Sequence, residues 1–379
     1  MGPLEGTRII ELAGIGPGPF CGMLLADLGA EVVLVDRKGG SLPFNAQPKY
    51  DLTRRGKRSI AVDLKQPGAA EVVLRLIEQS DGLIEGFRPG VMERLGLGPD
   101  VCLARNPRLA YGRLTGWGQD GPLAQAAGHD INYVALSGIL YHGGHRDSAP
   151  AVPPTVVGDV GGGAMFMAVG LLAAILSARA TGRGQVIDTA ITDSCALMST
   201  LVQGLRAQHL WADRRQSNAL DGGAHWYDCY QCADGEWISV GALEPQFYRL
   251  LVEKCGLAGE GLESAQFDVA RWPELKARMA TLFLSKSRAE WCTLLEGTDV
   301  CFAPVLSFAE APGHPHNRAR GAYVELGGVT QPAPAPKFGA TPAEVRSPPA
   351  GIGEHSLALL EAAGYSAIEI EALRSSGVV

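Results

Sequence analysis

The chain has 379 residues, of which 46% are hydrophobic and 19% are charged, so it can bury a large core and is long enough for two domains. Its formal net charge of -7 argues against a general nucleic-acid-binding protein, because such proteins need basic surface to displace the counterions of the phosphate backbone. Eight cysteines without dense or regular spacing are typical of reduced thiols in an intracellular protein, so we expect no disulfides.

Neither a leader nor a membrane span is predicted. The first residues lack the charged start and apolar run of a signal peptide, and we expect a cytoplasmic protein. The most apolar stretch, residues 164–180, is interrupted by Gly170 and Ser177 and is short for a bilayer. We expect it to form a buried helix.

Strands and helices alternate through the first half of the chain. Hydrophobic patterning predicts strands at residues 7–12, 31–35, 81–85, 108–114 and 185–189, and helices at 19–28, 67–79, near 130–140, 162–180 and 193–211. Strands that alternate with helices indicate βαβ units, so we expect an α/β fold with a Rossmann-like, open parallel sheet.

The pattern changes near residue 227. Segments 227–232 and 236–240 flank Ala233-Asp234-Gly235, which is a strong hairpin signal. Amphipathic stretches follow at 272–284 and 288–295, then a connector rich in Pro and Gly at 326–352, then helices at 354–363 and 366–375. We therefore expect a large domain over residues 1–215, completed by 330–379, and a small α+β domain over 216–329.

The segment Gly14-Ile15-Gly16-Pro17-Gly18-Pro19 lies between a predicted strand and helix, like a dinucleotide-binding loop, and Asp36 closes the next strand. Pro19 takes the place of the third glycine of that motif, and Pro17 removes an amide. We interpret the segment as a shaped turn at the edge of a site, and not as a nicotinamide site.

Positive charge is concentrated in Arg54-Arg55-Gly56-Lys57-Arg58, with Lys65 close behind. Arg37 and Arg88 stand at the carboxyl ends of predicted parallel strands, where open α/β sheets bind ligands. Most charge runs are solvated faces. The size of this cluster nevertheless favours a ligand with a few phosphates.

Three ionisable residues each have a functional and a structural interpretation. His129 precedes a predicted helix, where free amides favour negative charge. Asp159 lies among glycines, which favours close approach of a ligand, and Glu244 precedes Pro245 at another helix start. Helix capping alone would also explain each of them. Cys229 and Cys232 form a single CxxC without a second pair, so no metal site is predicted.

Together these segments resemble the family III CoA-transferase superfamily, and within it the α-methylacyl-CoA racemases, along nearly the whole chain. The motifs that carry the resemblance are Pro3-Leu4-Glu5-Gly6, Glu11-Leu12-Ala13, Ala26-Asp27-Leu28-Gly29-Ala30, Asp63-Leu64-Lys65, Glu85-Gly86-Phe87-Arg88-Pro89-Gly90, Thr115-Gly116-Trp117-Gly118-Gln119, Gly128-His129-Asp130-Ile131-Asn132-Tyr133 and Glu244-Pro245-Gln246-Phe247-Tyr248. The aspartate at 159 is shared by both branches, whereas His129 and Glu244 are the additions of the racemases.

The resemblance implies an enzyme that interconverts (2R)- and (2S)-2-methylacyl-CoA thioesters through an enolate. His129 and Asp159 would exchange the α-proton, Glu244 would orient the imidazole, and the backbone amide of Asp130 would face the thioester oxygen. CoA is part of the substrate, so we expect no separate cofactor and no metal. Two alternatives stay open: a family III CoA-transferase with Asp159 as nucleophile, and an acyl-CoA-binding protein without activity.

The resemblance also implies an interlocked homodimer, in which the large domain of one subunit and the small domain of the other form each active site. We expect no nucleic acid or membrane as partner. The residues expected to contact the CoA thioester are Arg37, Arg54, Arg55, Lys57, Lys65, Arg88, Tyr133 and Tyr227.

Overall fold

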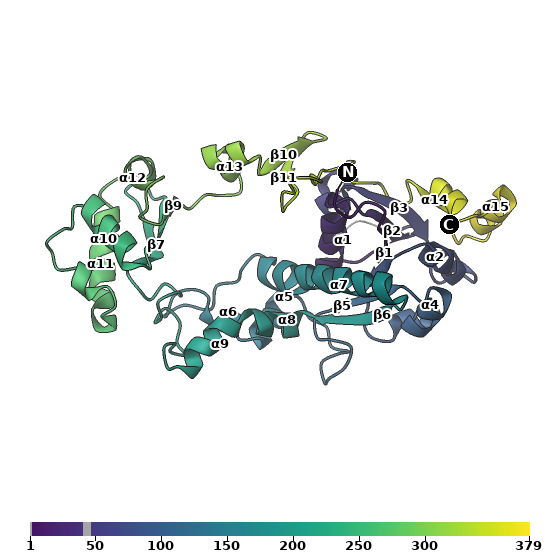
Figure 1. Ribbon diagram of the computed structural model, residues 1–379, viewed down its shortest axis with the longest axis horizontal. Helices are drawn as coiled ribbons and strands as arrows, with labels where there is room; N and C mark the ends of the chain where they lie inside the picture. The colour runs from purple at the N-terminus through teal and green to yellow at the C-terminus, as the bar shows by residue number, and fades with distance from the viewer. Residues whose placement is uncertain (1, 41–46) are drawn as a thin grey trace. The chain divides into compact units, whose positions relative to one another are not determined.

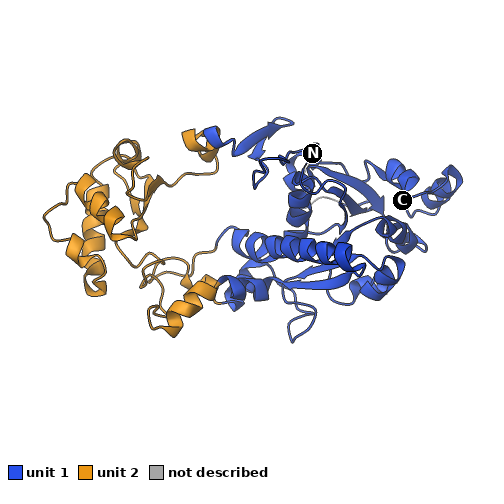
Figure 2. Ribbon diagram, in the orientation of Figure 1, with its two compact units in different colours: residues 1–137, 153–198, 319–379 blue, residues 138–152, 199–318 orange. Residues whose placement is uncertain are grey.

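A computed structural model describes residues 2–40 and 47–379 (Figure 1). The chain divides into two compact units (Figure 2). Unit 1 comprises residues 1–137, 153–198 and 319–379, and unit 2 comprises 138–152 and 199–318. The expected boundaries differ from these, because residues 138–152 and 199–215 belong to the second unit and residues 319–329 to the first.

Unit 1 is built on a six-stranded, fully parallel sheet of order β3-β2-β1-β4-β5-β6. Its strands are β1 (Arg8–Leu12), β2 (Glu31–Arg37), β3 (Lys57–Val62), β4 (Gly82–Glu85), β5 (Ala110–Thr115) and β6 (Gln185–Ala190). The strand order reverses between β1 and β4, as in doubly wound dinucleotide-binding folds. The predicted Rossmann-like sheet is confirmed, although β3 was not among the predicted strands.

Helices connect these strands and flank the sheet (Figure 1). They are α1 (Pro17–Asp27), α2 (Ala69–Glu78), α3 (Val91–Arg94), α4 (Pro99–Arg105), α5 (Asp130–Leu136), a π-helix (Val156–Met165), α7 (Phe166–Thr181) and α8 (Ile191–Met198), with short 3₁₀ turns at Pro48–Tyr50 and Leu52–Arg54. Helix α7 lies on β5 and β6, and its Leu171 and Met167 pack over Gly82 of β4 and Gly112 of β5. These strand glycines allow the helix to approach the sheet closely.

The π-helix and α7 form one apolar stretch, Val156–Thr181, whose 26 residues are enough by length and composition alone to cross a membrane. Met167, Leu171 and Ile175 are buried, which agrees with the predicted buried helix. Val169 and Leu176, however, are each 67% exposed within the described chain. The helix is therefore a core element on one side and carries uncovered apolar side chains on the other.

Residues after 319 return to unit 1. Strands β10 (Tyr323–Leu326) and β11 (Val329–Pro332) form an antiparallel hairpin, so the prediction of a purely extended connector over 326–352 is wrong at its start. Helices α14 (Ser356–Ala362) and α15 (Ala367–Ser375) then dock on the sheet, as expected. Leu359 and Leu360 enter the core that contains Ile60 and Val62 of β3.

Unit 2 contains a three-stranded antiparallel sheet of order β7-β8-β9. The strands are β7 (Tyr227–Gln231), β8 (Trp237–Gly241) and β9 (Phe302–Pro304), and the helices are α6 (Ile139–His142), α9 (Thr200–Ala207), α10 (Pro245–Lys254), α11 (Trp272–Phe283) and α12 (Arg288–Leu295), with 3₁₀ turns at Glu263–Ala265, Val269–Arg271 and Ala311–Gly313. Helix α13 (Pro315–Arg320) starts in this unit. The predicted β7–β8 hairpin is confirmed, and β9 joins it from far along the chain. Trp226, Tyr248 and Trp291 are buried in the core of this unit.

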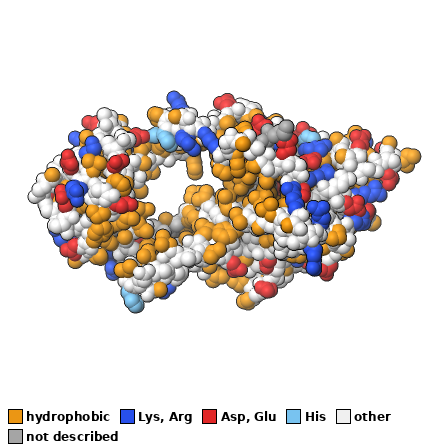
Figure 3. Space-filling view, viewed as in Figure 1, with side chains coloured by type: hydrophobic (Ala, Val, Ile, Leu, Met, Phe, Trp, Pro, Cys, Tyr) orange, Lys and Arg blue, Asp and Glu red, His pale blue; other side chains and the backbone are white. Residues whose placement is uncertain are grey.

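The charged side chains of unit 1 are mixed on the face that Figure 3 shows, with Lys and Arg beside Asp and Glu. The ion pairs of unit 1 also mix the two signs, since Arg105 contacts both Glu71 and Glu78. Such interspersed charge does not make a broad basic patch on this face, in keeping with the acidic composition.

Candidate active site

A cavity of about 420 Å³ lies in unit 1 at the carboxyl ends of four strands. It is lined by residues within one position of the ends of β1, β4, β5 and β6, namely Leu12, Ile84, Leu114 and Ile191. The strand order reverses between β1 and β4, and open α/β sheets bind their ligands outside this point. The predicted site residues His129, Asp159, Arg88 and Tyr133 all line this cavity.

His129 caps the N-terminus of α5 with extended backbone (φ -134°, ψ 172°). Its backbone N–H donates to Oδ1 of Asn132 at 3.0 Å, which closes the first turn of the helix. The side chain of His129 is exposed and lines the cavity. The ring can therefore meet a ligand in the cavity.

Tyr133 supports the loop that precedes His129. Its hydroxyl donates to the carbonyl of Gly128, and its ring meets Trp117 edge to face with centroids 4.7 Å apart. A Cβ at Gly116 would lie 2.0 Å from this ring, so only glycine fits there. Tyr133, predicted as a CoA contact, lines the cavity while its hydroxyl is used within the protein.

Asp159 lies in the first turn of the π-helix and is half-buried. Oδ2 accepts a hydrogen bond of 3.0 Å from the hydroxyl of Thr155, and its backbone N–H donates to Oδ1 of Asp130 at 2.6 Å. Burial raises the pKa of the Asp159 carboxyl, and so does the charge of Asp130, whereas the Thr155 hydrogen bond and His129 lower that pKa. A π-helical turn and a carboxyl with a raised pKa are both frequent at functional sites.

The glycines around Asp159 have a different role from the predicted one. A Cβ at Gly158 would lie 2.4 Å from Oδ1 of Asp130, one at Gly162 would lie 2.7 Å from Sγ of Cys195, and one at Gly163 would lie 2.8 Å from Pro17. They allow the π-helix to pack against α5, α8 and α1. The expectation that these glycines admit a ligand is therefore wrong, because protein atoms take up the space.

Thr155 precedes the π-helix with φ 46° and ψ 10°. Left-handed backbone is costly for a β-branched residue and is retained mainly where the surroundings enforce it. Here the conformation accompanies a hydroxyl hydrogen bond to the Asp159 carboxylate. Thr155 was not among the predicted site residues, because Pro153-Pro154-Thr155 carries no signal for such a contact.

His129 and Asp159 line the same cavity, and His129 lowers the pKa of Asp159. An imidazole and a carboxyl that face one cavity can donate and accept protons at a ligand between them. The geometry of unit 1 therefore suits proton transfer.

The family model described as CoA-transferase family III matches residues 4–356. The chain belongs to CoA-transferase family III.

Relatives within family III cover almost all of the chain. The alpha-methylacyl-CoA racemases of Mus musculus and Homo sapiens are each 44% identical to it, over 99% of this chain and 97% of theirs. The crystal structure of a CAIB/BAIF family protein from Brucella suis superposes with a TM-score of 0.82 at 25% identity, over 96% of this chain and 99% of that one. The predicted family is thus confirmed.

Most of the basic cluster of this family III protein is buried. Arg54 pairs with Asp36, Arg55 with Asp27 and Lys57 with Glu11, each at 2.6 Å. These cations contact carboxylates of β1, β2 and α1, and all six side chains are buried.

The prediction that Arg54, Arg55 and Lys57 bind CoA phosphates is therefore wrong. A buried cation needs a carboxylate partner, and these three residues already have one. The sequence did carry a signal for these ion pairs. Acidic residues are rarely buried without a partner, and Glu11, Asp27 and Asp36 lie in or beside strands and a helix that were predicted to be buried. Asp36, once considered for a ribose, is one of these structural acids.

Three of the predicted phosphate contacts remain exposed. Arg88 lines the cavity, Arg37 ends β2, and Lys65 follows β3 by three residues. Because the strands are parallel, their carboxyl ends share one edge of the sheet, where these cations are available for anions.

Unit 2 carries the two other predicted residues. Glu244 is the N-cap of α10 with Pro245 at the first helical position, as expected, and its side chain is exposed. Tyr227 opens β7, is 38% exposed and lines a hollow of about 640 Å³ together with Trp237 and Cys301.

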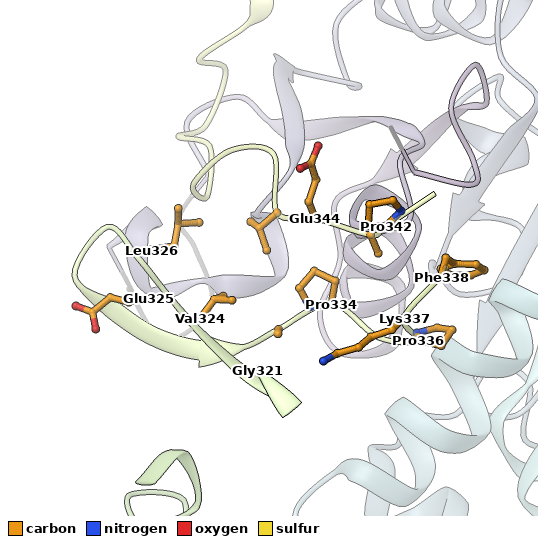
Figure 4. A pocket seen from close by; sticks show the side chains of 13 residues that line it. Gly321, Val324, Glu325, Leu326, Pro334, Pro336, Lys337, Phe338, Pro342 and Glu344 are labelled. Carbon is orange, nitrogen blue, oxygen red and sulfur yellow. The ribbon is translucent and has the colours of Figure 1, made fainter. Parts of the chain in front are cut away.

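A further hollow, of about 510 Å³, lies beside the β10–β11 hairpin of unit 1 (Figure 4). Pro334, Pro336, Pro342 and Phe338 make most of its wall apolar. It contains none of the predicted site residues. Throughout residues 2–40 and 47–379, no group of three or more His, Cys, Asp or Glu side chains is placed to hold a metal ion.

Proposed function

We propose that the protein is an α-methylacyl-CoA racemase, which interconverts the 2R and 2S forms of 2-methylacyl-CoA thioesters. One observation carries the proposal. His129 and Asp159 line one cavity of unit 1, in a family III chain that is 44% identical to racemases of that name.

The reaction needs a base, an acid and a stabilised enolate oxygen, because the α-hydrogen of a thioester is weakly acidic. In one direction Asp159 removes the proton and His129 returns one to the opposite face, and the roles exchange for the other isomer. The raised pKa of Asp159 makes its carboxylate a stronger base than that of an exposed aspartate.

The enolate oxygen is proposed to bind at the start of α5. Asp130 is the first residue of that helix, so its backbone N–H has no acceptor in a preceding turn. Such an amide favours developing negative charge. No separate cofactor and no metal step is part of this proposal, since CoA belongs to the substrate.

Glu244 is proposed to orient the imidazole of His129 from the partner subunit of an interlocked homodimer. Exposed apolar side chains on α7 and α8, among them Val169, Leu176 and Leu197, support an interface. We also propose that Arg88, Arg37 and Lys65 contact phosphates of CoA, that Tyr227 of the partner subunit contacts the acyl chain, and that the protein is cytoplasmic.

Deuterium exchange tests the racemase proposal. The purified protein is incubated in D₂O with a pure 2-methylacyl-CoA isomer and no acceptor acid, and label at C2 is followed by mass spectrometry. We expect label to enter as the stereocentre equilibrates, and both His129→Ala and Asp159→Ala to slow exchange on the order of 100-fold or more. No label with the wild type would overturn the proposal, and transfer of CoA to added acids would then favour the transferase alternative.

Subunit complementation tests the interlocked dimer. His129→Ala and Glu244→Ala chains are unfolded, mixed and refolded together. Random pairing makes about half of the dimers mixed, and in an interlocked dimer each mixed pair has one complete site out of two. About a quarter of wild-type activity should therefore return. If both residues of a site come from one chain, each mixed dimer carries two defective sites and no activity returns.

A further inference from the structure

Glu85, at the end of β4, is a buried carboxylate with two fixed contacts. Oε2 accepts a hydrogen bond of 2.7 Å from the backbone N–H of Phe87, and Oε1 accepts one of 3.0 Å from Nε of Arg113. The first contact holds the turn that leaves the strand. The second joins that turn to the neighbouring strand, where Arg113 lies opposite Glu85 in register.

Arg113 continues the connection to helix α3. Its two terminal nitrogens donate to the two carboxylate oxygens of Glu93 at 2.8 and 3.3 Å. A two-pronged Arg–carboxylate contact fixes orientation as well as distance. The three side chains, which we call the Glu85–Arg113–Glu93 bridge, therefore hold both ends of the loop at residues 86–90.

That loop forms one wall of the cavity. Gly86, Phe87, Arg88 and Pro89 all line it, and Nε2 of Gln125 donates to the carbonyl of Pro89 at 3.1 Å. Arg88 is exposed, and no hydrogen bond or ion pair engages its guanidinium within the described chain. The loop backbone is thus held on both sides while its cation is left free toward the cavity.

The cost of the bridge argues for a role beyond packing. Burial raises the pKa of Glu85, and Arg113 and the Phe87 N–H lower it, so the carboxylate depends on these contacts. Buried ionic groups contribute little net stability compared with well-packed apolar residues, and they are retained in some proteins because they define one geometry. Here the geometry they define is that of the Arg88 loop.

We infer that the Glu85–Arg113–Glu93 bridge positions Arg88 to bind a phosphate of the CoA ester, and so sets CoA affinity without taking part in proton transfer. The inference rests on the proposed function for its ligand. The three bridge residues are positioning residues, because they act through Arg88.

The test uses Glu93→Gln, since the Glu93 side chain is 45% exposed and the variant should fold. We expect KM for exchange and Kd for free coenzyme A to rise about fivefold to tenfold, with kcat within about twofold, because a charge-assisted two-pronged contact is lost. Arg88→Ala should likewise raise KM and Kd and leave kcat within about twofold of the wild-type value. In the Arg88→Ala background, Glu93→Gln should add less than twofold, which a general loss of structure would not produce.

The matched control is Glu71→Gln. Glu71 makes a similar two-pronged contact with Arg105, at 3.0 and 2.7 Å, is 43% exposed and does not line the cavity. It should leave KM and Kd unchanged. Glu93→Gln with unchanged Kd, or with an equal effect in the presence and absence of Arg88, would overturn the inference. Failure of the proposed function would instead show as wild-type protein that binds coenzyme A without exchanging label.

Discussion

The carboxylate of Asp130 accepts a 2.6 Å hydrogen bond from the backbone N–H of Asp159. Asp130 is also the first residue of α5, directly after His129. One side chain thereby ties the helix start that carries the imidazole to the π-helix that carries the carboxyl. The separation of the proposed acid and base is thus set by a local contact within unit 1.

Replacing Asp130 by Asn tests this relationship. An amide oxygen still accepts the hydrogen bond, but the negative charge that raises the pKa of Asp159 is gone. The pKa of Asp159 should therefore fall, and the acidic limb of the rate profile for exchange should move to lower pH. Asp130→Ala, which also removes the acceptor, should cost about tenfold or more in kcat through misplacement. An unchanged pH profile in Asp130→Asn would contradict this assignment.

Thr155→Val should have the opposite effect on the same group. The valine has nearly the same shape but cannot donate to the carboxylate, so the pKa of Asp159 rises and the acidic limb moves to higher pH. We expect about a tenfold lower kcat at neutral pH, because hydrogen bonds to charged groups are among the stronger ones. Thr155→Ser should restore the wild-type profile. A profile for Thr155→Val that matches the wild type would show that the hydroxyl does not act on Asp159.

The Lys57–Glu11 pair is expected to govern stability. Nζ of Lys57 contacts Oε2 of Glu11 at 2.6 Å and the carbonyl of Pro19, in α1, at 2.9 Å. Lys57→Met leaves a buried carboxylate without its cation and should cost about 3–5 kcal/mol in the free energy of unfolding.

Urea unfolding measures this cost, and the double variant Lys57→Met/Glu11→Gln should recover part of it. Arg105→Met, which breaks the exposed ion pairs with Glu71 and Glu78, should change stability by less than about 1 kcal/mol. A double variant no more stable than Lys57→Met would show that the loss comes from packing, and not from the unpaired charge.

His225 should make unit 2 sensitive to acid. Its Nε2 lies 2.7 Å from the hydroxyl of Tyr248 in a fully buried position, and burial lowers the pKa of the imidazole from 6.5 to about 4. The unfolded chain therefore binds a proton before the folded one does. Stability is present above pH 6.5 and is lost as the pH falls toward 4, by about 3 kcal/mol in total.

Fluorescence of the neighbouring core tryptophans, followed in urea at pH 7 and at pH 4.5, checks this dependence. His225→Gln should show a smaller difference between the two pH values, whereas Tyr248→Phe should keep the difference, because the buried imidazole remains. An equal difference in His225→Gln and wild type would assign the acid sensitivity to other groups.

The strands with clear apolar runs were predictable from sequence, and β3 was not. Its first residue, Lys57, follows two arginines, and such a run of basic residues is typical of a solvent-exposed segment. Only their carboxylate partners explain why they are buried. Those partners are 18 to 46 residues away in sequence, so only the folded sheet brings them together. The β10–β11 hairpin was hidden in the same way, among prolines and glycines that suggest an extended connector.

The candidate site was predicted in part. His129 and Asp159 were identified, and the cavity contains both. The environment of Asp159 was not predictable, because it depends on a left-handed Thr155 and on a π-helix packed through glycines. The pairing of Glu244 with His129 stays a prediction, since the two residues belong to different units.

Residues 356–378 complete the core of a sheet whose first strand begins at Arg8. Val378 is buried, and its carbonyl accepts a hydrogen bond of 2.8 Å from the backbone N–H of Asp63. During translation, a nascent chain that has passed residue 320 still lacks Leu359, Leu360 and Ile370, which cover apolar side chains near β3. The parallel sheet is therefore left partly uncovered on the ribosome, and it closes only after nearly all of these residues have been synthesised.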